Sequence, residues 1–314
     1  MLSVLQSVLE PFLLIALGYA LSGTKLFSAK SLWDGVEKLV FWVLFPPLLF
    51  NSVAHASLSG VPAGKFLLVG TLAMAVGVLM AKVVSRLAPA DPRTDASVRQ
   101  TGYRFNSYIC FALALNMYGE EVLALTALLT GVWVPISNAL AVADLSMAAD
   151  KEGRTGPADI AKAIFTNPLI VATLAGLAAN LLGRWTGFAV PSFLSKFCDS
   201  LGSASTATAL LSIGAGLAVA DFSRYAKLIT LSTLQRLAAL PAVALCVALA
   251  ADLEASQTAA LMCYAVVPTA NSCYIMATRM GGNGAVVSDL TSVEVLASLV
   301  TIPLWFVLLR SLGV

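Results

Sequence analysis

The polar runs Phe105-Asn106-Ser107-Tyr108 and Pro268-Thr269-Ala270-Asn271-Ser272 interrupt two stretches of the chain that are otherwise apolar. Each run lies in the fourth of five hydrophobic segments in its half of the sequence. A lipid bilayer tolerates an opened helix only where protein encloses the backbone or where the backbone lines a cavity. Paired interruptions in corresponding segments of two halves are typical of binding sites in membrane carriers. The two runs therefore predict two broken helices around one substrate site.

The composition indicates an all-α integral membrane protein. Of the 314 residues, 59% are hydrophobic and 11% are charged, and the mean hydropathy is +0.87. A helix needs roughly 20 apolar residues to cross a hydrocarbon core about 30 Å thick, and the sequence offers about ten such segments. We place these transmembrane helices near residues 3–23, 31–54, 64–86, 97–117, 121–145, 162–182, 190–219, 226–250, 257–278 and 287–311.

The lysines and arginines predict the orientation, because short loops rich in these residues stay on the cytoplasmic side. One set of loops holds most of them: Lys25, Lys30, Lys82, Arg86, Arg93, Arg99, Lys151, Arg154, Lys162, Arg224, Lys227 and Arg279. The other set contains only Lys65 and Arg184, with Arg310 near the C-terminus. We therefore expect a multi-pass protein of the inner (plasma) membrane with both termini on the outer side. The net charge of +2 is too small to indicate nucleic acid as a partner.

The longest polar stretch, near residues 144–162, divides the chain nearly in half. It predicts a linker between a first five-helix repeat, residues 1–155, and a second five-helix repeat, residues 156–314. Because five is an odd number, the second unit must cross the bilayer in the opposite sense, which is the geometry of an inverted repeat. Similar runs at residues 114–119 and 277–282 follow the two breaks in the same order.

The residues at the two breaks suit ligand binding. At an interrupted helix, one half-end presents free N–H groups and the other presents carbonyl oxygens. Asn106 and Asn271 can donate and accept without the cost of a buried charge. Pro268 removes a backbone donor and disfavours helix at the residue before it. The alternative is that these polar groups only bond between packed helices. The candidate substrate-binding residues are Arg104, Asn106, Ser107, Pro268, Thr269, Ala270, Asn271 and Ser272.

Ionisable groups inside the predicted helices each leave two interpretations open. Arg104 either counters a substrate carboxylate or extends to the cytoplasmic surface. Glu294 either carries a proton or serves in a salt bridge or at a cavity wall. Arg236 lacks an obvious partner, and a bridge to an acidic group is one interpretation. The candidates for ion coupling are Glu294 for a proton and, with the oxygen atoms at the breaks, Asn138 and Thr130 for Na⁺.

A series of motifs resembles one known family. They follow in order along nearly the whole chain: Phe45-Pro46-Pro47-Leu48-Leu49-Phe50, Arg104-Phe105-Asn106-Ser107-Tyr108, Tyr118-Gly119-Glu120-Glu121, Asn167-Pro168-Leu169-Ile170, Gly214-Ala215-Gly216-Leu217, Pro268-Thr269-Ala270-Asn271 and Thr301-Ile302-Pro303-Leu304-Trp305. In this order the motifs resemble the auxin efflux carrier family of secondary transporters, which spans bacterial carriers and the plant auxin exporters.

The resemblance implies a bile-acid-transporter-like, NhaA-like fold of ten transmembrane helices, in which the broken helices 4 and 9 cross. It also implies a transport domain from helices 3–5 and 8–10 that moves against a scaffold domain from helices 1, 2, 6 and 7. The chain departs from many relatives in two places. Cys110-Phe111-Ala112 stands in place of a Gly-x-Pro after the first break, and Glu294 stands where relatives tend to have an uncharged residue.

These observations predict a secondary active transporter of small organic anions, mono- or dicarboxylates with auxin-like indole carboxylates included, that works by elevator-type alternating access. A facilitative channel, or a uniporter without ion coupling, is the alternative. We do not expect an enzyme, because the chain has a single histidine and lacks a His-Glu-x-x-His motif. We expect no cofactor and no metal, while Na⁺ or H⁺ could couple to transport. The expected partners are the substrate anion, the lipid bilayer and a second copy bound through the scaffold domain.

Overall fold

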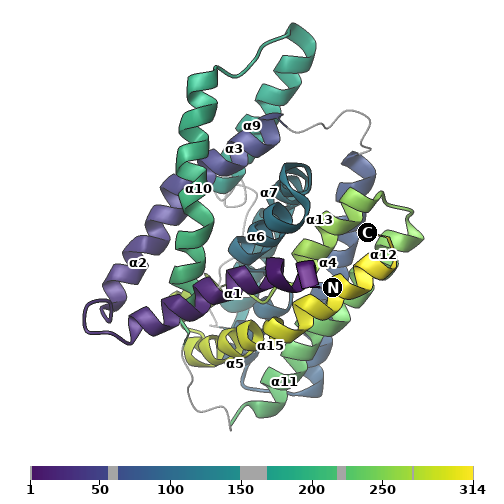
Figure 1. The fold of residues 1–314 in the computed structure, drawn as a ribbon. Helices are drawn as coiled ribbons and strands as arrows, with labels where there is room; N and C mark the ends of the chain where they lie inside the picture. The colour runs from purple at the N-terminus through teal and green to yellow at the C-terminus, as the bar shows by residue number, and fades with distance from the viewer. Residues whose placement is uncertain (1, 56–62, 149–167, 218–223, 271, 314) are drawn as a thin grey trace.

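The computed structural model describes residues 2–55, 63–148, 168–217, 224–270 and 272–313, and every regular element in these ranges is a helix (Figure 1). The first half contains α1 (Leu2–Ser22), α2 (Lys30–Leu39), α3 (Phe45–His55), α4 (Ala63–Leu87), α5 (Pro92–Arg99), α6 (Ser107–Tyr118) and α7 (Glu120–Ala148). The second half contains α9 (Pro168–Thr186), α10 (Ser192–Ala215), α11 (Ala226–Leu234), α12 (Leu240–Ala250), α13 (Ala255–Ala265), α14 (Ser272–Arg279) and α15 (Gly284–Ser311). The prediction of an all-helical fold is confirmed.

Five helical stretches of the described chain are long and apolar enough to cross a membrane. They are Lys30–His55, Gly64–Leu87, Glu120–Ala148, Ala226–Ala250 and Gly284–Ser311. Their outward faces are apolar as well, since Leu68, Leu72 and Leu79 of α4 are all exposed. Side chains of this kind on one face of a long helix are typical of contact with lipid. The protein is therefore a multi-pass membrane protein.

The helices follow the predicted segments closely, with differences at two places. The segments expected near residues 97–117 and 257–278 each form two helices with an irregular stretch between them, whereas each of the others contains one continuous helical run within the described ranges. The linker expected near residues 144–162 begins later than predicted, because α7 continues to Ala148 and includes Asp144. The remainder of that linker lies outside the described residues.

Prolines explain two local widenings of the helices. Residues Val40–Leu44 and Gln235–Ala239 are π-helical and are followed by Pro46 and Pro241. A proline has no N–H to donate to the carbonyl four residues earlier, so the turn before it widens. At the second widening the Leu237 carbonyl, which Pro241 leaves without its helical donor, accepts the Trp305 indole N–H at 2.9 Å.

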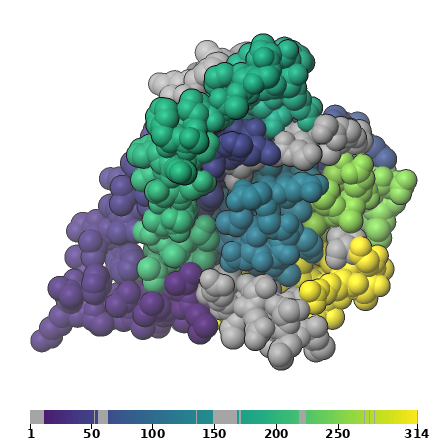
Figure 2. All heavy atoms as spheres, turned by 45° about the horizontal axis from the view of Figure 1, so that its top comes forward, coloured from purple at the N-terminus to yellow at the C-terminus, as the bar shows by residue number. Residues whose placement is uncertain are grey.

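The helices pack in two groups. In one group α1 packs on α10, while α3 packs on α9 and α10. Glycines allow the close approach, since a Cβ at Gly18 would overlap the backbone of Leu211 and a Cβ at Gly214 would overlap that of Ile15. In the other group α13 packs on α6, α7 and α12, and α12 packs on α4. Figure 2 shows α10, in teal, on one flank of the molecule and residues of α15, in yellow, on the other.

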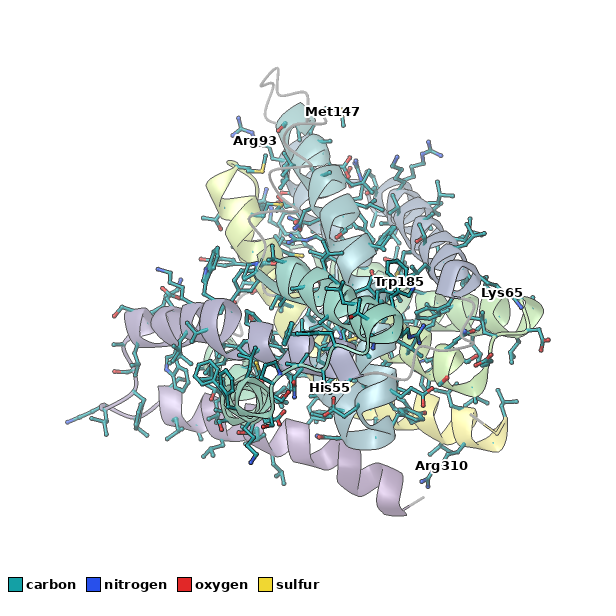
Figure 3. All side chains as sticks on the ribbon, turned by 90° about the horizontal axis from the view of Figure 1, so that it is seen from above. His55, Lys65, Arg93, Met147, Trp185 and Arg310 are labelled. Atoms are coloured by element: carbon teal, nitrogen blue, oxygen red, sulfur yellow. The ribbon has the colours of Figure 1, made fainter. Side chains whose placement is uncertain are left out.

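Polar contacts join several helices near their ends. Arg93 and Met147 lie at one edge of the view in Figure 3, where Arg99 on α5 pairs with Asp144 on α7 at 3.1 Å. Asp91 caps α5 there, and hydrogen bonds from Thr94 hold the pKa of its carboxyl below its usual range. Away from this edge, the Lys65 ammonium donates to the Asp252 carbonyl at 3.0 Å and joins α4 to the turn before α13.

Candidate functional site

The first break lies between a short 3₁₀ turn, Gln100–Gly102, and α6. Asn106 ends the break as the N-cap of α6, because its Oδ1 accepts from the backbone N–H groups of Tyr108 and Ile109, both at 3.1 Å. Asparagine is among the best N-cap residues, and the helix then runs without interruption to Tyr118. The irregular stretch thus precedes Ser107 and Tyr108, which the sequence placed inside the break and which form the first turn of α6.

The second break follows α13, which ends at Ala265, and precedes α14, which begins at Ser272. Pro268 lies in this stretch and cannot donate a backbone hydrogen bond. Thr269 is fully buried, and its N–H donates to Oε2 of Glu294 at 2.8 Å. Asn271, the asparagine that the sequence assigned to this break, lies outside the described residues.

The two breaks touch each other through their backbones. The Asn106 N–H donates to the Pro268 carbonyl at 2.8 Å. The Phe105 and Tyr264 rings pack with their centroids 3.9 Å apart. Asn106 is only 2% exposed, and its Nδ2 has no hydrogen-bond partner within the described residues. A buried donor without a partner among the described residues is suited to a ligand, because leaving it unpaired is costly.

Arg104 spans the two breaks. Its Nη1 donates to Gln100 Oε1 at 2.7 Å, and its Nη2 donates to Ser272 Oγ at 2.8 Å. The residue is 6% exposed, so the interpretation in which it extends to the membrane surface is wrong. No described carboxylate forms an ion pair with its guanidinium. A buried guanidinium without a counter-ion is a suitable partner for a carboxylate ligand.

A cavity of about 420 Å³ opens beside the Arg104 guanidinium. This volume falls within the usual range for small-molecule sites. The described residues that line it with polar groups are Arg104, Ser107, Thr130, Ser137, Asn138 and Ser272, and those that line it with apolar groups are Phe41, Phe105, Val134, Val142, Leu169, Ala270, Met276 and Met280. The cavity therefore combines one cationic group with an apolar wall.

The structure gathers some of the predicted site residues and separates others. Arg104, Ser107, Ala270 and Ser272 line the cavity, as do the ion-coupling candidates Thr130 and Asn138. Thr130 also donates to the Thr126 carbonyl of its own helix at 2.8 Å. Asn106, Pro268, Thr269 and Glu294 are not among the lining residues that the structure describes. Asn106 and Pro268 instead join the breaks, and Glu294 supports the second break from α15.

The sequence analysis did not identify some residues that support the site. Gln100 is buried and accepts a hydrogen bond from Arg104. It lies four residues before Arg104, and this spacing could have indicated the contact from the sequence. Gln235 donates to the Gly102 carbonyl at 3.0 Å, a contact between distant segments with no local signature. The suggested bridge from Arg236 to an acidic group is also wrong, since its hydrogen bonds go to two backbone carbonyls. Within the described chain, no cluster of three or more His, Cys, Asp or Glu residues could hold a metal ion.

The comparison with protein families indicates a membrane transporter. Residues 157–306 match the model of a family described as membrane transport protein, and that family includes the auxin efflux carriers. The match contains the second break, Arg236 and Glu294, and it confirms the resemblance that the sequence motifs indicated for this part of the chain. The matched family is one of transporters and not of enzymes. The comparison with curated proteins finds no match.

Proposed function

We propose that the protein is a secondary active transporter of small organic anions and that it binds them in the cavity between the two breaks. The observation that supports this most directly is the Arg104 guanidinium, which is buried at the cavity wall without a carboxylate partner among the described residues. A substrate carboxylate would complete its coordination. The neighbouring hydroxyls of Ser107 and Ser272 would then hydrogen-bond the substrate.

The cavity wall favours a monocarboxylate with an apolar body over a dicarboxylate. Arg104 is the one cationic side chain among the described lining residues, whereas Phe41, Phe105 and Met276 offer apolar surface. A second carboxylate would enter without a countercharge, and this is expensive in a low-dielectric site. Indole carboxylates meet this description by size and chemistry and belong to the proposed substrate class.

We further propose elevator-type alternating access in a fold of ten membrane segments arranged as two inverted repeats. The packing of α1, α3, α9 and α10 on one another supports a scaffold domain, through which two copies could pair, and the packing of α13 on α6, α7 and α12 supports a moving domain. The backbone contact between the breaks supports their crossing, and both termini would face outward. During transport the two breaks and the cavity beside them would move together against the scaffold.

A uniporter without ion coupling is the second candidate. The observation that favours it is the position of Glu294, the candidate for proton coupling, which bonds to Thr269 at the second break and is not among the described lining residues of the cavity. A proton on Glu294 would then have no direct contact with a substrate in the cavity.

Ligand-induced thermal stabilisation, together with uptake into proteoliposomes, tests the carboxylate site. We expect aromatic or branched-chain monocarboxylates to raise the melting temperature, since a ligand that binds only the folded state stabilises it. Arg104→Gln should weaken binding about 10- to 100-fold, the amount expected for a lost charged hydrogen bond. Arg104→Lys should bind with intermediate affinity, because it retains the charge without the planar fork.

The matched control is Arg184→Gln, which removes the same charge from an exposed position on α9 and should leave binding unchanged. Undiminished carboxylate binding by Arg104→Gln would contradict the proposed site. Electrodiffusive currents far above carrier rates would instead identify a channel.

A further inference from the structure

The end of α13 is bound by a buried cation that belongs to the protein. Arg236 is fully buried, and its Nη1 and Nη2 donate to the carbonyls of Ala265 at 2.8 Å and Tyr264 at 3.3 Å. These are the last two residues of α13, directly before the second break. The C-terminal end of a helix has unpaired carbonyls and a partial negative charge. The guanidinium therefore lies where the backbone would attract a positive ion.

A π-helical turn places Arg236 and its neighbour between the two breaks. Gln235 and Arg236 are consecutive residues of the segment Gln235–Ala239. Gln235 donates to the Gly102 carbonyl before the first break, while Arg236 donates to the carbonyls before the second. Trp133 supplies the next donor, from its indole N–H to the Tyr103 carbonyl at 3.2 Å. The carbonyls of Gly102, Tyr103, Tyr264 and Ala265 thus already have protein donors.

Glu294 binds the second break from another helix, α15. Its Oε2 accepts the Thr269 N–H, while its Oε1 and the Arg236 Nε have no hydrogen-bond partner within the described residues. The two side chains form no direct ion pair. The guanidinium thus binds the carbonyls that end α13, and the carboxyl group binds an N–H in the irregular stretch. Each group complements the local polarity of the backbone.

In carriers with broken helices, the carbonyls at unwound segments and half-helix ends are the usual ligands of a coupling Na⁺. We propose that Arg236 serves as a fixed cation in place of such an ion, so that the second break is held together without Na⁺. If the protein is the carrier proposed above, its transport of substrate should be independent of Na⁺. This prediction for transport rests on the proposed function. Arg236 is a positioning residue, since it does not line the substrate cavity.

The test measures thermal unfolding of the purified protein in NaCl and in N-methylglucamine chloride of equal ionic strength, without substrate. The wild-type protein should melt at the same temperature in both salts. Arg236→Gln should melt at least about 5 °C lower, because the buried carbonyls that end α13 lose their charged donor. It should also regain part of this loss with NaCl in a saturable manner. Arg236→Lys retains a cation and should show no response to Na⁺.

The double variant Arg236→Gln/Glu294→Gln separates a charge effect from a packing effect. If the two charges compensate each other, the double variant should be more stable than Arg236→Gln alone and should not respond to Na⁺. Losses that add, with no response to Na⁺ in Arg236→Gln, would overturn the proposal. Stabilisation of the wild-type protein by Na⁺ over N-methylglucamine would also overturn it, and this arm holds even if Arg236→Gln fails to fold.

Uptake measurements distinguish a failure of this proposal from a failure of the carboxylate site. If no carboxylate binds but Na⁺ stabilises only Arg236→Gln, the fixed cation is supported and the substrate class is wrong. If carboxylate uptake by the wild-type protein requires Na⁺, the substrate class is supported and the fixed cation is wrong.

Discussion

Asn106 uses its amide oxygen in the fold, while its amide nitrogen has no partner among the described residues. Oδ1 caps α6, and Nδ2 is buried without a partner among the described residues. The sequence suggested this residue because an amide can both donate and accept in the membrane interior. It could not show that the acceptor is used by the helix and that the donor is left available. The distinction follows from the orientation of one side chain and leads to a test at this residue.

Asn106→Ala should lose both the cap and Nδ2, whereas Asn106→Ser should retain the cap, since serine is nearly as good an N-cap as asparagine. We expect Asn106→Ala to cost about 1 kcal/mol of stability and Asn106→Ser clearly less. Both variants should bind carboxylates more weakly, because both lack Nδ2. Thermal unfolding with and without ligand measures the two effects separately. Equal destabilisation by alanine and serine would argue against the cap, and unchanged ligand binding would argue against the donor.

At the scale of elements, the polar runs predicted the two interruptions correctly, but the shape of the neighbouring helices was not foreseen. Pro268 lies in the second break, and a proline is a local signal for an interrupted helix because it has no backbone N–H to donate. The first break lies a few residues earlier than predicted, since the cap formed by Asn106 starts α6 at Ser107. Gln235 contacts Gly102, which is 133 residues away in the sequence, and Arg236 contacts Ala265, which is 29 residues away. No local sequence pattern specifies such contacts.

Gly102 tests the packing of the first break against the π-helical segment. A Cβ at this position would overlap Oε1 of Gln235 and the Ala81 side chain. Gly102→Ala should therefore cost about 1–3 kcal/mol, as overpacking of a tight interior does. It should also weaken ligand binding, because the Gln235 contact would be displaced.

Gly35→Ala is the matched control. Gly35 lies in α2 with open space around its Cα, so alanine there should be neutral or stabilise the helix by about 0.5–1 kcal/mol. Thermal unfolding of the two variants side by side gives the comparison. A Gly102→Ala protein as stable as Gly35→Ala would show that the break tolerates a shift of Gln235.

At the scale of the whole molecule, the sequence predicted a helical membrane protein, and the structure and the family match confirm it. The hydrophobic segments were readable because each bilayer crossing demands a long apolar run. The grouping of helices could not be predicted from the sequence alone. Gly18 and Gly214 allow two helices to approach closely, but a glycine in a sequence does not indicate which helix it packs against. Gly176 is a further example, because it packs against the Phe50 carbonyl of the same chain.

The orientation is a property of the whole molecule and can be tested with single cysteines. In a background with the exposed Cys246 replaced by serine, Lys65→Cys should react with a membrane-impermeant thiol reagent in intact cells. Arg93→Cys should react only after permeabilisation, since the basic loops are expected in the cytoplasm. Both residues lie in the first turn of a helix, Lys65 in α4 and Arg93 in α5, on different parts of the molecule in Figure 3. The reverse labelling pattern would place both termini inside.

The π-helical turn at Gln235–Ala239 also affects how this chain can change over time. Such a turn holds one residue more than an α-helical turn spanning the same hydrogen bonds. Loss of a single residue there leaves a regular α-helical turn, so α11 and α12 would keep their mutual orientation. The same loss within α12 would rotate one side of the helix against the other by about 100°, because an α-helix has 3.6 residues per turn. We therefore expect the fold to accept a one-residue deletion in Gln235–Ala239 more readily than in α12, at the cost of the side-chain contacts that this turn makes to the breaks.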